Sequence, residues 1–234
     1  MPIFQYRFGS GLQKLKWLHE QGVTGKALLT TVETAWRRRP DYYNVPWRGK
    51  WQTELGGALL TLAVHAHDAV YYILGHAQSV AAHVATLVNS IETEDSASVS
   101  LQMVDGSLCS LSVTTGSAVQ ISRHRFCFSN LTAESNLQPY ANTSGEWTFS
   151  ADSPEAEEKI TQVLKEFTPQ PEGLTGQFAR YYHAMQTNAA LPVTLRDARA
   201  SLELVTAIYH SARTKQTEQL PIGNDHPLYA GWQP

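Results

Sequence analysis

Residues 97–113, ASVSLQMVDGSLCSLSV, carry the clearest structural pattern in the sequence. Apolar side chains alternate with polar ones on both sides of Asp105-Gly106. Such alternation is typical of a half-buried β-strand. An Asp-Gly pair between two alternating runs predicts a hairpin turn in which both residues have a positive φ. The stretch therefore predicts two antiparallel strands that share one buried face.

On both sides of this hairpin, the apolar pattern predicts more strands in the middle of the chain, and it predicts helices before and after them. Further strands are expected at Ile3–Phe8, Lys26–Trp36, Ser79–Val88, Arg123–Ser129, Thr132–Tyr140, Glu146–Ser150 and Gln219–Ile222. Helices are expected at Leu12–Leu18, Glu54–Leu74 and Gly173–Asn188, and after Ser153 and Thr194. This order indicates an α+β fold with a large, mostly antiparallel open sheet and helices packed on one face.

Two helix starts have specific capping signals. Ser153 precedes Pro154, which suits an N-cap followed by proline at the first helical position. Thr194 stands three residues before Asp197, as in a capping box. We therefore expect helices to begin at both points.

The composition of the 234-residue chain argues against several classes of protein. Eighteen Lys+Arg against 21 Asp+Glu give a net charge of -3, so there is no electrostatic reason to expect nucleic acid. No apolar run reaches the ~18 residues that span a membrane, and the N-terminus does not read as a signal peptide. Cys109 and Cys127 form neither a disulfide framework nor a metal cluster. We expect a soluble cytoplasmic protein.

The most suggestive polar group lies in the predicted helix Glu54–Leu74. Thr61, His65 and Asp68 fall within about 60° of one another on a continuous helix. Histidine suits proton transfer near neutral pH, and Asp68 could orient its imidazole. The alternative is a partly buried helix that satisfies its polar groups locally. Gly56-Gly57 just upstream would let a ligand or another backbone segment approach closely.

Other groups of residues are weaker candidates for a functional site. His65 and His67 point about 200° apart on a helix, so we expect no metal site there. The stretch 37–52 combines arginines with Tyr42, Tyr43, Trp47 and Trp51, which is more typical of a functional loop than of a structural one. No nucleophile motif is present. Gly9-Ser10-Gly11 lacks the third glycine of a dinucleotide fingerprint, since Lys14 stands there.

Several blocks together resemble the second domain of the Gfo/Idh/MocA family of NAD(P)-dependent oxidoreductases, in the family's order. The most specific block is 56–68, GGALLTLAVHAHD, which resembles the family's substrate-side helix. The others are 5–8 (QYRF), 14–16 (KLK), 22–26 (GVTGK), 47–51 (WRGKW), 192–194 (PVT), 200–209 (ASLELVTAIY), 220–222 (LPI) and 226–227 (HP).

The resemblance implies hydride transfer between a sugar or polyol carbon and a nicotinamide, either NAD or NADP. It implies that His65 is the proton donor or acceptor and that Thr61 positions the substrate. It also implies substrate contacts from Arg48, Trp47, Tyr43 and Asp68, and a cofactor edge near Gln5 and Arg7.

Two features depart from the family's pattern. Neither a glycine fingerprint nor a Glu-Lys-Pro motif is present, so we expect the dinucleotide-binding domain to be absent. Residues 1–10 would be a remnant of the linker or last strand of that domain, and residues 11–234 a single domain. The second departure is Thr61, which stands where members with a catalytic Asp–His pair have aspartate, and threonine cannot serve as a base.

The sequence thus predicts the substrate-binding and oligomerisation part of an oxidoreductase, inactive without a cofactor domain and assembled as a homo-oligomer through its sheet. An alternative is a non-catalytic protein, derived from the same family, that binds a sugar-type ligand or acts as a scaffold. A third, weaker interpretation is a metal-dependent sugar isomerase or hydrolase that uses the histidines.

Overall fold

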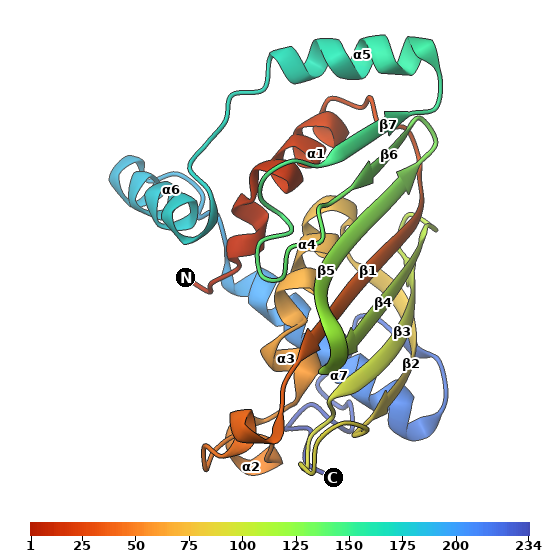
Figure 1. The fold of residues 1–234 in the computed structure, drawn as a ribbon, viewed down its shortest axis with the longest axis vertical. Coiled ribbons are helices and arrows are strands. Elements are labelled where there is room, and N and C mark those ends of the chain that lie inside the picture. The colour runs from red at the N-terminus through yellow and green to blue at the C-terminus, as the bar shows by residue number, and fades with distance from the viewer.

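The computed structural model describes all 234 residues and contains one eight-stranded sheet (Figure 1). The strand order is β7-β6-β5-β1-β4-β3-β2-β8. The strands are β1 (Ala27–Arg37), β2 (Ala77–Ala85), β3 (Ser96–Met103), β4 (Leu108–Thr114), β5 (Gly116–Phe128), β6 (Leu131–Glu134), β7 (Thr148–Ala151) and β8 (Glu218–Gln219). Every neighbouring pair is antiparallel except β1 and β4, which run parallel. The predicted α+β class with a mostly antiparallel open sheet is confirmed.

The predicted hairpin joins β3 and β4, but its turn differs from the expected one. Met103 N–H donates to the Ser107 carbonyl at 2.8 Å, and Gly106 N–H donates to the Met103 carbonyl at 2.9 Å. Of the two expected turn residues, only Gly106 has a positive φ, at 85°. The loop is therefore a three-residue turn closed by a left-handed glycine, a common hairpin connection.

Helices cover one face of the sheet and leave the other face bare (Figure 1). Helices α1, α4 and α7 lie against the covered face, where their leucine, alanine and valine side chains join one large hydrophobic core. The helices are α1 (Ser10–Glu20), α2 (Trp51–Glu54), α3 (Ala58–Thr61), α4 (Val64–Leu74), α5 (Pro154–Lys165), α6 (Gly173–Thr187) and α7 (Leu195–Thr214), with 3-10 turns η1 (Gln5–Phe8) and η2 (Pro40–Tyr43).

The long helix expected over Glu54–Leu74 is divided into α2, α3 and α4. The first break follows Leu55, which has a left-handed φ of 67°, and includes Gly56-Gly57. The second follows Thr61, where the Ala63 N–H reaches back five residues to the Ala58 carbonyl instead of four. No single helix of the chain is long and apolar enough to cross a membrane. The segments Trp51–Thr61 and Val64–Leu74, whose axes differ by 49°, together have the length and apolar composition of a broken membrane span.

Three other sequence expectations need correction. Ile3–Phe8 is not a strand: residues 5–8 form η1, where Tyr6, Arg7 and Phe8 are all buried, so no face of the segment alternates. The strand expected at Thr132–Tyr140 ends at Glu134. The last strand contains only Glu218 and Gln219, because only these two residues pair with β2.

Two histidines lie buried inside the helix-covered core and make the fold sensitive to acid. Burial lowers the pKa of His67 to about 3 and that of His124 to about 4. The His124 Nε2–H donates to the Ala66 carbonyl at 3.3 Å, while its Nδ1 accepts from the Asn142 side-chain amide. Both contacts suit a neutral ring.

We expect these two histidines together to lower the free energy of unfolding by roughly 3–4 kcal/mol between pH 7.5 and pH 5. The unfolded chain binds protons at these histidines below about pH 6.5, whereas the folded chain does not until the pH reaches their lowered pKa values. Stability is therefore full above pH 6.5 and is lost as the pH falls. Urea unfolding at the two pH values measures this. His67→Leu should remove about half of the loss, and His83→Leu, at an exposed site, should leave it unchanged. Equal stability at both pH values would contradict the prediction.

Candidate active site

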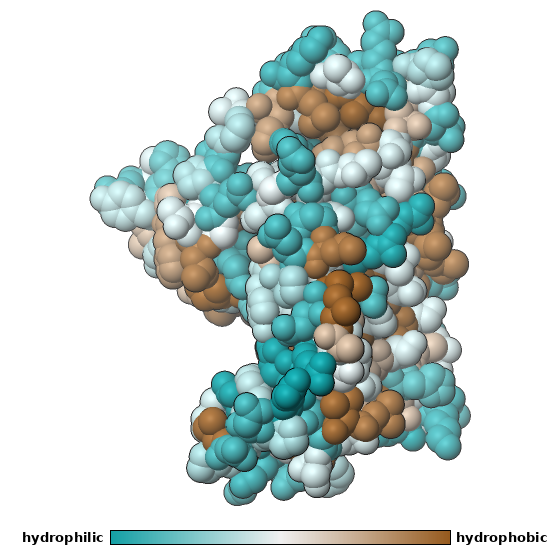
Figure 2. All heavy atoms as spheres, in the orientation of Figure 1, coloured by the Kyte–Doolittle hydropathy of each residue, from teal (hydrophilic) through white to brown (hydrophobic).

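The covered side of the molecule is hollowed between two lobes (Figure 2). The upper lobe contains α6 and the lower one contains η2 and α2, while α3 and the first turn of α4 lie between them (Figure 1). The helix break between α3 and α4 places Thr61 at the end of one piece and His65 in the first turn of the other. The two residues that the sequence selected for chemistry therefore lie on either side of this helix break.

His65 is a half-buried imidazole held between aromatic rings. The Tyr6 ring lies 5.6 Å away and the Phe4 ring 6.1 Å away in an edge-on arrangement, so η1 and the segment before it determine the orientation of the imidazole. Its Nδ1 is buried without a hydrogen-bond partner. Burial lowers the pKa of His65. At neutral pH the ring is therefore uncharged, with one nitrogen able to accept a proton.

Asp68 lies one turn further along α4, and its carboxylate binds Arg7 and not His65. Its carboxylate is 1% exposed and accepts from Arg7 Nε at 2.7 Å and from Arg7 Nη2 at 2.6 Å. Arg7 Nη2 also reaches Asp197 Oδ1 at 3.0 Å. The charges of Arg7 and Asp68 therefore fasten η1 to α4 and to the start of α7, and no hydrogen bond joins Asp68 to His65. Gln5, in the same 3-10 turn, has a buried Oε1 without a partner.

Gly56-Gly57 accommodates another backbone segment, which was one of the two possibilities left open by the sequence. A Cβ on Gly57 would lie 1.9 Å from the Glu94 carbonyl oxygen. The Glu94 carboxylate accepts from Gly57 N–H at 3.0 Å, from Leu59 N–H at 2.9 Å and from the Tyr209 hydroxyl at 2.8 Å. Glu94 therefore satisfies the orphan N–H groups at the start of α3 and connects that start to α7.

The loop of residues 37–52, called the aromatic loop below, lies next to Thr61. Tyr42, Tyr43 and Thr61 line one narrow pocket together with Glu54, Gly57, Ala58, Leu62 and Thr93. Burial raises the pKa of Tyr43 to about 12, so its hydroxyl stays protonated. Thr61 itself donates back to the Gly57 carbonyl at 2.9 Å.

Arg48 is packed flat against aromatic rings of the same loop. Its guanidinium carbon lies 3.8 Å from the centre of the Tyr42 ring and 4.9 Å from that of Trp47, within the range of cation–π attraction. One of its amino groups donates to the Tyr42 carbonyl at 3.1 Å, and its Nε is buried without a partner. Trp47 is 47% exposed. The loop thus presents an oriented cation and an open aromatic face.

The sequence interpretation missed His124 and Glu94. His124 on β5 binds the carbonyl of Ala66, the residue after His65, and so connects the sheet to the first turn of α4. The only signal in the sequence was that His124 alternates in step with Phe126 and Phe128, whose side chains point to the buried face of the strand. Glu94 gave no such signal, because it lies in a loop and acts on residues 35 and 37 positions away.

Gly9-Ser10-Gly11 packs against protein atoms. A Cβ on Gly9 would lie 2.3 Å from the Thr143 backbone, and one on Gly11 would lie 2.0 Å from the Trp147 ring. The space beside these glycines is therefore filled by the segment before β7, which leaves no room for a pyrophosphate.

Comparison with known proteins gives a consistent match. The family described as GFO/IDH/MocA C-terminal domain matches residues 12–130, just over half of the 234-residue chain. An uncharacterized oxidoreductase from Synechocystis is 29% identical over 128 residues, which cover 49% of this chain and 34% of that protein.

Two solved structures resemble the chain closely in fold. The WlbA dehydrogenase of Bordetella pertussis, in complex with NADH and UDP-GlcNAcA, is 28% identical with a TM-score of 0.79, covering 94% of this chain and 64% of that one. The WlbA enzyme of Chromobacterium violaceum, in complex with the same two molecules, is 26% identical with a TM-score of 0.77, covering 94% and 62%. The chain thus spans about a third of the Synechocystis protein and less than two thirds of either WlbA chain.

Proposed function

This chain belongs to the Gfo/Idh/MocA family of oxidoreductases through its C-terminal domain, and we propose that it supplies the substrate-binding part of an NAD(P)-dependent enzyme that acts on a CH–OH carbon of a sugar-type compound. The observation that carries the proposal is His65: a neutral, partly exposed imidazole, oriented by two aromatic rings, in the first turn after the break between α3 and α4. The core residue His67 also has an Nδ1 without a partner but is only 3% exposed, so partial exposure is what distinguishes His65.

In this proposal His65 transfers the proton of the reacting hydroxyl. A neutral imidazole accepts the hydroxyl proton when the carbon is oxidised and returns it when the carbonyl is reduced. Thr61, the last residue before the break between α3 and α4, donates its proton to the Gly57 carbonyl, so its oxygen would accept from a substrate hydroxyl without acting as a base. Asp68 contributes by fixing α4 through Arg7, so its proposed substrate contact is indirect.

The loop carrying Tyr43, Trp47 and Arg48 would bind the rest of the substrate. Aromatic faces stack on the apolar faces of sugar rings, and a guanidinium donates hydrogen bonds to carboxylate or hydroxyl oxygens. The stacked Arg48 loses little freedom on binding, because Tyr42 and Trp47 already hold it in place. A sugar acid or a nucleotide-linked sugar acid would use both features.

We propose that these 234 residues do not by themselves form a site for a nicotinamide dinucleotide. Their sheet has one parallel pair, β1 with β4, whereas dinucleotide folds are built from successive parallel strands. The Gly9-Ser10-Gly11 turn is filled by Thr143 and Trp147. We therefore propose that residues outside this stretch hold NAD or NADP and that Gln5 and Arg7 lie near the edge of that cofactor. The 234 residues alone would then be catalytically inactive. Their cytoplasmic location is part of the same proposal.

The bare face of the sheet supports a homo-oligomer. Leu29 on β1, Leu108 on β4 and Cys127 on β5 are register partners on that face and form a partly exposed row. A second copy that covers this face would bury the row together with the surrounding serines and threonines. Sedimentation velocity at micromolar concentration should show a dimer or larger, and Leu108→Glu should shift it to monomer. A wild-type monomer would contradict this part of the proposal.

The substrate proposal is tested by thermal unfolding of the 234-residue chain with added ligands. UDP-GlcNAcA is the first choice, because a relative covering 94% of this chain was solved with it, followed by free sugar acids, neutral sugars, NAD and NADP. We expect a sugar-type ligand to raise the melting temperature and the nucleotides to leave it unchanged. Arg48→Met should abolish the rise, while Arg39→Met, an exposed arginine near the same loop, should preserve it. A rise with NAD or NADP and none with any sugar-type ligand would contradict the proposal.

A further inference from the structure

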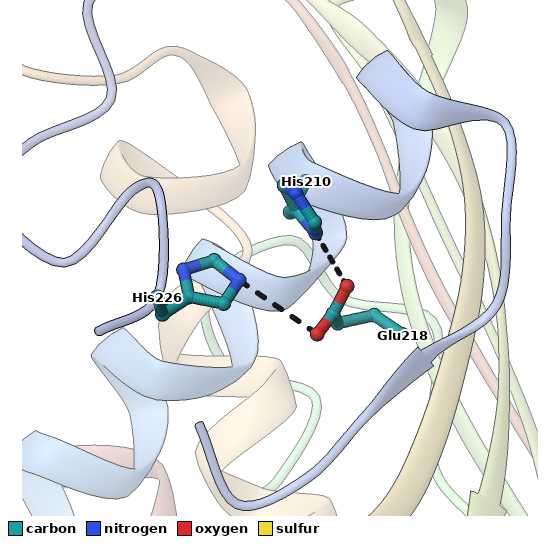
Figure 3. Close-up of side chains that lie close together, drawn as sticks. All are labelled: His210, Glu218 and His226. Carbon is teal, nitrogen blue, oxygen red and sulfur yellow. Dashed lines mark hydrogen bonds and ion pairs between the residues drawn. The ribbon is translucent and has the colours of Figure 1, made fainter. Parts of the chain in front are cut away.

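Three potential metal ligands converge where α7, β8 and the C-terminal tail meet, away from the proposed substrate site. They are His210 near the end of α7, Glu218 on β8 and His226 in the tail (Figure 3). Their ligand atoms all lie within 4.8 Å of one another. The two imidazoles approach the carboxylate from different sides, as Figure 3 shows.

His226 is the member that ordinary packing does not explain. Its side chain is only 6% exposed, and its Nε2 is buried without a hydrogen-bond partner. The nearest acceptor, Glu218 Oε1, is 3.7 Å away, which is too far for a hydrogen bond. The other oxygen, Oε2, is already in contact with His210 Nδ1. A buried polar nitrogen thus points into the gap that the other two side chains border.

We propose that His210 Nδ1, Glu218 and His226 Nε2 bind one divalent transition-metal ion of the zinc type. Two imidazole nitrogens and one carboxylate form a known three-ligand set for zinc, in which water takes the fourth position. The side chains of His210 and Glu218 are 21% and 20% exposed, so an ion and its water can enter. Magnesium and calcium fit poorly, because they prefer oxygen ligands.

Ion binding requires both imidazole protons to move. The Leu228 N–H donates to His226 Nδ1 at 3.1 Å, so without an ion the His226 proton is on Nε2. Coordination by Nε2 transfers that proton to Nδ1, and the Leu228 amide loses its acceptor. His210 Nδ1 carries the proton in its contact with Glu218 Oε2, so that proton moves to Nε2 when Nδ1 coordinates. We therefore expect the turn at residues 226–228 to rearrange when the ion binds.

The ion would fasten the tail to α7 and β8. The tail otherwise rests on α7 through Trp232, whose Nε1–H donates to Thr206 Oγ1 at 2.9 Å, and through a contact between Arg213 and the Trp232 carbonyl. Tyr209, on the same helix, donates to Glu94, the loop residue whose carboxylate also binds the N–H groups at the start of α3. An ion at this position therefore stabilises the helix that supports the proposed substrate site, without entering that site.

The test titrates Zn²⁺ into the EDTA-treated 234-residue chain by calorimetry and follows its thermal unfolding. We expect one ion per chain and a higher melting temperature, with no such effect from Mg²⁺. His226→Gln and Glu218→Gln should each weaken binding by at least about the 10–100-fold that losing even an outer-shell partner costs. His83→Gln, at an exposed site on β2, should bind as the wild type does.

Co²⁺ absorption and the Leu228 amide signal provide readouts that do not depend on melting behaviour. In the wild type we expect the intense visible bands of four-coordinate Co²⁺ and a shifted Leu228 amide resonance. Failure to bind Zn²⁺ stoichiometrically would overturn the proposal and leave a hydrogen-bonded His–Glu–His contact. Undiminished binding by folded His226→Gln would overturn it equally, by placing the ion elsewhere.

Discussion

Replacing His65 by glutamine is expected to lower the kcat of the oxidoreductase to which this chain contributes by about 10²–10⁴, the usual effect of removing a general acid–base. Glutamine roughly preserves the volume and polarity of the side chain but cannot exchange a proton near neutral pH. Steady-state kinetics with the sugar-type substrate and NAD or NADP measure the effect. His83→Gln, an exposed histidine on β2, is the matched control and should leave kcat unchanged.

The pH profile distinguishes proton transfer from positioning. Burial lowers the pKa of His65, so the neutral ring persists below the ordinary histidine range, and oxidation should lose rate only at more acidic pH. The glutamine variant should lack this acidic limb. If His65→Gln instead raises KM while kcat and the pH profile stay as in the wild type, His65 binds substrate and does not transfer its proton.

Arg7→Met is expected to destabilise the fold by about 3–5 kcal/mol, because it leaves the Asp68 carboxylate buried without a partner. Arg7 supplies both hydrogen bonds that Asp68 accepts. Burial raises the pKa of Asp68 to about 6, and the hydrogen bonds and charge of Arg7 oppose that rise. Denaturant unfolding at pH 8 measures the loss.

The matched control is the double variant Arg7→Met/Asp68→Leu, which replaces the ion pair by apolar groups and should recover most of the stability. The sign of the pH dependence is also determined. Without Arg7 the pKa of Asp68 rises further above its unfolded value, so the deficit of the single variant grows as the pH rises from 5.5 to 8. A deficit below about 1 kcal/mol, or one that shrinks with rising pH, would show that Arg7 does not hold Asp68 as described.

Most of the fold followed from local signals in the sequence. The alternation around Asp105-Gly106 identified β3 and β4, because strands with one buried face carry the period of two in their side chains. Ser153 accepts from the Ala156 N–H, and Thr194 forms a capping box with Asp197, so both predicted helix starts are confirmed. These signals work because each depends on residues at most a few positions apart.

The errors lie where distant residues decide the local conformation. The apolar stripe from Leu55 to Ile73 predicted one helix, but Glu94 fixes the Gly56-Gly57 turn from a loop far along the chain. The segment Ile3–Phe8 has a strand-like composition, yet Arg7 is drawn to Asp68 and Asp197 on two helices, and residues 5–8 coil to reach them.

The candidate site was predicted in part for the same reason. Thr61 lines one narrow pocket with Tyr42 and Tyr43, and His65 follows it across the helix break. Spacing grouped Thr61 with His65, whereas only the family resemblance joined the loop residues to them. Asp68 was expected to orient His65, but only the tertiary structure reveals that Arg7 already occupies its carboxylate. Aromatic rings of Phe4 and Tyr6 orient His65 instead, from a segment about 60 residues earlier in the chain.

If His65 faces the bound sugar-type ligand, its ring must sense that ligand, and the imidazole NMR spectrum of the histidine-labelled chain during titration with UDP-GlcNAcA and sugar acids tests this. Assignment by His65→Gln identifies the His65 signals. We expect a ligand that raises the melting temperature also to shift the His65 ring resonances, while those of exposed His83 stay in place. Saturable binding with an unmoved His65 signal would contradict it.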